Sequence, residues 1–173
     1  IKNEFFWELM RKQGYSITGK MNPTDRDILE KMSPITTAFY IVPLVNAMIR
    51  VGSEAEKTRA FLAFIDGSQE VPSNKRGAKG TYEKVSIESA RECSNARNRQ
   101  NKTLETAISS VEDKIIKYNL LDNRILFVRL EDTDSFPSEL NGLMAMKLSA
   151  KYKRPTIVAR LNDEGFNRGS MRG

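Results

Sequence analysis

The chain has 173 residues, a formal net charge of +6, one cysteine and no histidine. The length allows one domain or two small ones, and a hydrophobic content of 39% is enough for a packed core. The missing histidine excludes Ser-His-Asp and Cys-His nucleophiles and histidine-ligated zinc sites, and the single cysteine excludes an internal disulfide.

The composition also suggests where the protein works and what it binds. A basic balance suggests an anionic partner, and one cysteine fits a reducing, cytoplasmic setting. The longest apolar run, about 38–49, contains Pro43 and Asn46 and is shorter than the roughly 20 residues that span a bilayer, so we expect no membrane partner. Because the chain opens with Ile1 and stops at Gly173 after a glycine-rich stretch, we expect a fragment of a longer protein.

The first part of the chain is predicted to be helical. Residues 1–13 have apolar side chains at helical spacing, and Thr24 can cap a short helix that Pro34 ends. An apolar stretch over 35–52 is expected to be broken at Pro43. Ser53 then caps a helix over 54–65.

Residues 66–80 are the clearest loop of the chain, with three glycines and three basic residues, and could form a domain boundary. One long polar helix follows from about Val85 to Tyr118, without glycine or proline. A helix this polar is typical of a connection between units or of a helix lying across a surface.

The last third changes to an α/β pattern. The sequence predicts a strand over 124–130, a helix from Pro137 to about Tyr152, a second strand over 155–161 and a third from Phe166. Strand, helix and strand at this spacing predict a right-handed crossover between parallel strands. The expected fold class is therefore α/β, with a helical first part, a long connecting helix and a small domain with a mixed or parallel sheet.

Two segments could bind an anion. Gly169, Ser170 and Arg172 could hold a phosphate through close backbone approach, a hydroxyl donor and a guanidinium, although the motif alone is more typical of a glycine turn at a strand end. Arg50 and Asn46 lie in the most apolar part of the chain, where they either face a groove or are a snorkelling arginine and a hydrogen-bonded asparagine. The basic residues of 147–173 fit a nucleic-acid footprint and a solvated edge equally well. The aspartates of 132–134 are too few for a confident cation site.

Taken in order, four segments resemble the RecJ-type single-stranded-DNA exonucleases. Residues 43–50 resemble that family's P-R-x-N-A-x-G-R segment, and 96–105 its L-N-x-x-R-R-x-x-E helix. Residues 136–158 resemble W-H-P-G-V-I-G-I-V-A-x-R-L-x-x-x-Y-x-R-P, and 169–172 the K-G-S-x-R-S that follows it. The resemblance covers roughly residues 40–173.

The resemblance implies a division of the chain and a function. Residues 1–66 would be the tail of a DHH catalytic domain, 67–122 the basic loop and connecting helix, and 123–173 a DHHA1-type α/β domain. The chain would supply strand and phosphate binding to a 5′-to-3′ exonuclease, with single-stranded DNA as partner and a single-strand-binding protein as a further candidate. Arg50, Ser170 and Arg172 would be phosphate ligands, Asn46 would fix the local backbone, and Gly169 would allow close approach.

The sequence departs from the family pattern. The family's glycine, its Trp-His pair and its final serine are replaced by Ile49, Ser135–Phe136 and Gly173, and no Asp-His-His motif is present. We therefore expect no catalytic residue, metal ligand or cofactor in this chain, and Mn²⁺ or Mg²⁺ in a catalytic domain outside it. Two alternatives stay open: a DHH-type phosphodiesterase for short oligonucleotides or cyclic dinucleotides, and a non-catalytic DHH-like nucleic-acid-binding scaffold.

Overall fold

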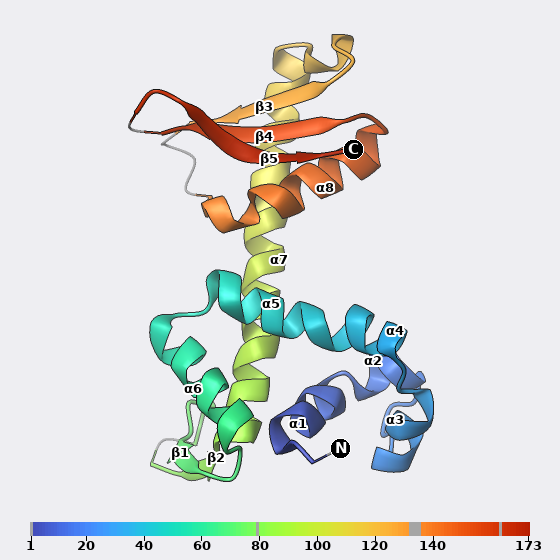
Figure 1. Cartoon of the computed structure of the whole chain (residues 1–173), viewed down its shortest axis with the longest axis vertical. Coiled ribbons are helices and arrows are strands. Elements are labelled where there is room, and N and C mark those ends of the chain that lie inside the picture. Colours follow the sequence, from blue (N-terminus) through green and yellow to red (C-terminus); the bar gives the residue numbers. More distant parts are fainter. Residues whose placement is uncertain (1, 79, 132–135, 163) are drawn as a thin grey trace. The chain divides into compact units, whose positions relative to one another are not determined.

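The computed structural model describes residues 2–78, 80–131, 136–162 and 164–173 (Figure 1). The chain forms two compact units, Ile1–Gln100 and Asn101–Gly173. The division falls inside the longest helix, α7 (Val85–Lys117), which matches the predicted connecting helix closely. The boundaries that the sequence suggests, after 66 and after 122, remain predictions.

Unit 1 is mainly helical, as the sequence predicts, and the helices after Thr24 and Ser53 begin where it predicts. They are α1 (Glu4–Lys12), α2 (Gly14–Thr18), α3 (Asp25–Lys31), α4 (Pro34–Thr36), α5 (Val42–Val51) and α6 (Glu54–Ile65). Thr24 and Ser53 each cap a helix, and both form complete capping boxes with the acidic residue three positions later. These caps satisfy backbone N–H groups that the first turn of a helix leaves without a partner.

The core of unit 1 joins these helices to the first half of α7. It consists of the buried residues Phe5, Leu9, Met10, Ile28, Ile41, Leu44, Ala47, Met48, Ala60, Ala63, Val85, Ala90, Cys93 and Ala96. Burial raises the pKa of the Cys93 thiol to about 12, so this cysteine is a packing residue and not a nucleophile.

The prediction that Pro43 breaks the apolar stretch is wrong. A π-helical segment, Thr37–Ile41, joins α4 to α5, and the Val42 N–H donates to the carbonyl of Thr37, five residues earlier. Pro43 then lies at the start of α5, where a missing N–H does no harm. The wider π turn therefore accommodates the proline without a break, and the helical path continues from Pro34 to Val51.

The helical path Pro34–Val51 is also long and apolar enough to cross a membrane, judged by length and composition alone. Core helices of soluble proteins pass the same test. The path carries Asn46 and Arg50 near its end, and 22% of Pro34–Val51 is buried in the structure. The expectation of no membrane partner remains a prediction.

The loop predicted over 66–80 contains structure that the sequence did not indicate. β1 (Glu70–Pro72) pairs antiparallel with β2 (Tyr82–Lys84), and the hairpin leads directly into α7. Both strands have three residues, too short to leave a periodic pattern.

Unit 2 confirms the predicted α/β class. After the end of α7 and a short 3₁₀ turn (Leu120–Asp122), the sheet has the order β3-β4-β5, formed by Leu126–Leu130, Thr156–Leu161 and Asn167–Arg172. β3 and β4 are parallel and β4 and β5 antiparallel, so the sheet is mixed. A second 3₁₀ turn (Ser138–Leu140) leads into α8 (Asn141–Tyr152), the predicted crossover helix. The assignment to the DHHA1 type remains a prediction.

Candidate nucleic-acid interface

The strand β5 presents its basic residues on the face of the sheet that α8 covers. Successive side chains of a strand point to opposite faces, so Arg168, Ser170 and Arg172 share one face. Ser170 pairs in register with Val158, which is fully buried. This face is therefore the covered one. Its two arginines, Arg168 and Arg172, are nevertheless exposed to solvent.

Arg160 of β4 adds a third cation to this face. It lies directly opposite Arg168 in the antiparallel register, and its Nη2 donates to the carbonyl of Phe136 at 2.9 Å. Arg160 and Arg168 therefore lie side by side on neighbouring strands.

A cleft of about 290 Å³ opens beside these residues. It is lined by Ser138, Asn141, Arg160, Leu161, Asn162, Arg168, Gly169 and Ser170. Asn141 is 4% exposed, and its Oδ1 has no hydrogen-bond partner among the described residues. A buried amide oxygen without a partner is costly, and this one could accept a hydrogen bond only from an N–H or O–H group in the cleft.

The first turn of α8 closes one side of the group. A side chain at Gly142 would place its Cβ 3.0 Å from Nη2 of Arg172 and 3.6 Å from Oγ of Ser170. The absence of a side chain at Gly142 thus lets Arg172 and Ser170 lie against the helix. Apart from one bond to the carbonyl of Met171, the Arg172 guanidinium makes no ion pair or hydrogen bond with the residues described here.

Gly169 has a packing role of its own. A Cβ at this position would lie 2.6 Å from Cα of Ala159 and closer still to the carbonyl oxygen of Val158. Only glycine fits this approach of β5 to β4. The role expected for Gly169, close approach to a ligand, remains a prediction, and the fit between the strands is an additional reason for the glycine.

Asn46 and Arg50 lie together on α5 in unit 1. They are four residues apart, so they occupy the same side of the helix, and both are partly exposed. Within the described part of the chain, neither side chain makes a hydrogen bond or an ion pair. Of the five predicted site residues, the structure brings Gly169, Ser170 and Arg172 together in unit 2.

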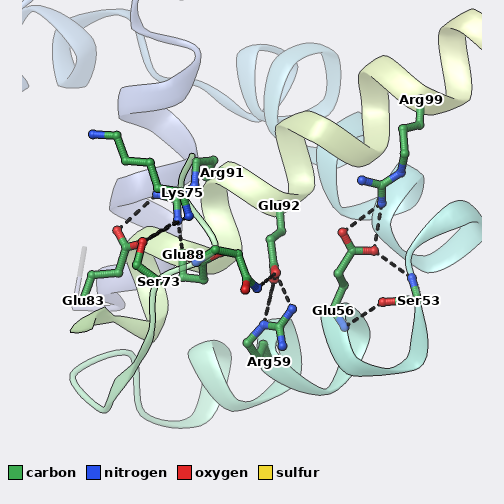
Figure 2. A network of polar contacts seen from close by, with 11 residues as sticks. Ser53, Glu56, Arg59, Ser73, Lys75, Glu83, Glu88, Arg91, Glu92 and Arg99 are labelled. Carbon is green, nitrogen blue, oxygen red and sulfur yellow. Dashed lines mark hydrogen bonds and ion pairs between the residues drawn. The ribbon is translucent and has the colours of Figure 1, made fainter. Parts of the chain in front are cut away.

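A network of carboxylates and arginines lies elsewhere in unit 1 (Figure 2). Arg59 binds Glu92, and its Nε donates to both carboxylate oxygens at 3.1 Å. Arg99 binds Glu56 at 2.8 and 3.0 Å. Arg91 binds both Glu83 and Glu88. All of these residues except Glu83 line a polar cleft of about 540 Å³, in which each arginine already has a carboxylate partner.

The two carboxyl groups at Arg91 have opposite pKa shifts. Hydrogen bonds from Arg91 lower the pKa of Glu83 to about 2. Glu88 is fully buried, and desolvation raises the pKa of its carboxyl group. Its Oε2 accepts from the backbone N–H of Asn74 at 3.2 Å, while its Oε1 has no partner among the described residues. The network therefore ties the hairpin to α7.

No group of three or more His, Cys, Asp or Glu side chains within the described ranges is placed to hold a metal ion. The aspartates of 132–134, considered above as a cation site, lie outside the described residues.

Sequence reasoning missed Asn141 as a member of the candidate site, and it placed Arg160 and Arg168 only in the general basic region 147–173. Arg168 was within reach, because positions 168, 170 and 172 have the period of a strand. Arg160 and Asn141 join the cleft only through the strand register and the crossover helix, which no local pattern reveals.

Two curated proteins are similar to the whole chain. One is the "Putative SPbeta prophage-derived single-strand DNA-specific exonuclease YorK" of Bacillus subtilis (strain 168), 34% identical over 178 residues. The other is the "Putative single-strand DNA-specific exonuclease yorK" of Bacillus phage SPbeta, with the same identity. The chain spans 28% of the length of these relatives. No protein-family model matches the chain.

Proposed function

We propose that this chain is the strand-binding part of a RecJ-like, 5′-to-3′ single-strand-specific exonuclease. The observation that carries the proposal is the cleft of unit 2, which Arg160, Arg168 and Ser170 line together. The similarity to proteins named as single-strand DNA-specific exonucleases supplies the substrate class: single-stranded DNA.

The cleft has the chemistry that a phosphate needs. Guanidinium groups offer paired N–H donors that match two phosphate oxygens, and a serine hydroxyl adds a third donor. Arg168, Ser170 and Arg172 lie on one face of β5, so one backbone segment presents all three. The proposed role of unit 2 is thus to grip phosphates of the strand.

Arg50 is proposed as a further phosphate ligand and Asn46 as the residue that fixes the backbone beside it. The partly exposed side chain of Arg50 has no partner among the described residues, so its charge is available to a strand. A single-strand-binding protein remains a candidate partner of the intact protein.

Metal chemistry belongs to another part of the proposed protein. The described residues do not form a ligand set for Mn²⁺ or Mg²⁺. In the intact exonuclease such ions would activate water for attack on the phosphodiester bond. The contribution of this chain is to bind and orient the strand.

Replacing Arg172 by alanine should weaken binding of a single strand about tenfold, because a charge-assisted contact is lost. The slope of log affinity against log salt should become shallower by about 0.7, the contribution of one phosphate on a single strand. Fluorescence anisotropy with a labelled oligonucleotide at several salt concentrations measures both.

Gly142→Ala is the matched second variant. Its added methyl group would lie 3.0 Å from the Arg172 guanidinium and displace it, while alanine in place of glycine stabilises a helix by about 0.5 kcal/mol. We expect weaker binding together with an unchanged or higher melting temperature. Unchanged binding and salt slope in both variants would contradict the proposed role of Arg172.

A further inference from the structure

The β1–β2 hairpin of unit 1 has one face against the protein and one face in solvent. Val71 and Glu83 pair in register and are half-buried. Pro72 and Tyr82, the next pair, point to the opposite side, and Tyr82 is 65% exposed. Tyr82 therefore leaves most of its surface in solvent.

The base of the hairpin is held firmly. The Ser73 N–H donates to the carbonyl of Thr81 at 3.0 Å, and Arg91 binds Glu83 from α7. Asn74 is tied twice, because its backbone N–H donates to Glu88 and its side-chain amide donates to Glu92, each at 3.2 Å. The loop that follows therefore starts from a fixed position on α7.

The tip beyond this base is basic. Lys75 and Arg76 are exposed, and their side chains make no ion pair or hydrogen bond with any residue the structure describes. Figure 2 shows Lys75 with no interaction drawn from its ammonium group. Glu83 and Glu88 both bind Arg91 instead.

We propose that this hairpin is a second contact site for single-stranded nucleic acid. Lys75 and Arg76 bind phosphates, and Tyr82 stacks on a base. Cationic groups and an exposed aromatic ring, here on one hairpin, are the combination that single-strand-binding surfaces use without reading sequence. The inference rests on the proposed function and deepens it, because it adds a strand contact in unit 1 that is separate from the cleft of unit 2.

The test is an anisotropy titration of the whole chain with a labelled strand of about 20 nucleotides, longer than a typical single binding site. The variant Lys75→Ala/Arg76→Ala should bind more weakly, with a salt slope shallower by about 1.4, or 0.7 for each phosphate lost. Tyr82→Ala should weaken binding about tenfold, while Tyr82→Phe keeps the ring and the affinity. The effects of the hairpin variant and of Arg172→Ala should add, since the two sites lie in different units.

The control is Lys12→Ala/Lys31→Ala, which removes two exposed charges from unit 1 away from the hairpin. Its salt slope should stay close to that of the unchanged chain. If the hairpin variants bind like the control while Arg172→Ala weakens binding, the inference is overturned and the proposed function stands. If the unchanged chain binds no strand, both fail. Polyglutamate and unlabelled DNA are compared as competitors for the hairpin. If polyglutamate displaces the labelled strand at the same concentration as unlabelled DNA, the hairpin serves an acidic protein and the inference is also overturned.

Discussion

Gly169→Ala is expected to destabilise unit 2 by about 3 kcal/mol, the upper end of the usual cost of overpacking. The added Cβ would lie 2.6 Å from Cα of Ala159 and nearer still to the carbonyl oxygen of Val158. Backbone atoms cannot turn aside as the end of a flexible side chain can, so β5 must separate from β4. Because β5 carries Ser170 and Arg172, the variant should also lose strand binding.

Chemical denaturation followed by circular dichroism measures the loss. Gly173→Ala is the control, because its Cβ would meet nothing closer than 3.5 Å, an ordinary contact with Pro155. A Gly169→Ala protein as stable as the Gly173→Ala protein would show that β5 does not pair with β4 in this register.

Arg91→Ala is expected to cost about 3 kcal/mol at neutral pH, because it leaves a buried and a half-buried carboxylate without their cation. Arg91 binds Glu83 and the fully buried Glu88. The same change frees the hairpin from α7, so hydrogen exchange of the amides over 70–84 should become faster. Wild-type stability in this variant would show that the network contributes nothing to the fold.

The cost of Arg91→Ala should depend on pH in a defined direction. Burial raises the pKa of Glu88, so its contribution to stability is present at low pH and is lost as pH rises through its folded-state value. Without Arg91 the ionised form is still less favourable, so the variant should recover stability relative to wild type as pH falls from 7 towards 5.

The double variant Arg91→Ala/Glu88→Gln, which cannot ionise at position 88, should lack this recovery. Urea denaturation at several pH values provides the comparison. Equal pH profiles for the single and double variants would mean that Glu88 is not the group responsible. Glu83 acts outside this range in the intact protein, because its pKa of about 2 places its loss of charge in strong acid.

Much of the fold could be predicted from local signals. Thr24 and Ser53 predict helix starts because their side chains can cap backbone N–H groups. The structure has complete capping boxes at both positions. The long polar helix follows from a stretch without glycine or proline, and the strand–helix–strand order of the last third follows from its change to an α/β pattern.

The rest depends on contacts between distant segments. The hairpin is stabilised by Arg91 and Glu88 on α7, not by its own three-residue strands. The π turn before Pro43 is a local adjustment within an otherwise helical path, and proline alone predicts only a break. For the candidate site, the sequence pointed to Ser170 and Arg172 on β5, whereas Arg160 lines the cleft together with Ser170 through the register of β4 and β5.

The central claim is that this chain binds single-stranded DNA through phosphate contacts. The most direct measurement is the anisotropy of a labelled single-stranded oligonucleotide titrated with the whole chain, with a 5′-phosphate or a 5′-hydroxyl, at two salt concentrations. If phosphate contacts hold the strand, we expect binding that weakens steeply with salt and is tighter for the 5′-phosphate. No binding at low salt, or binding indifferent to salt, would contradict it.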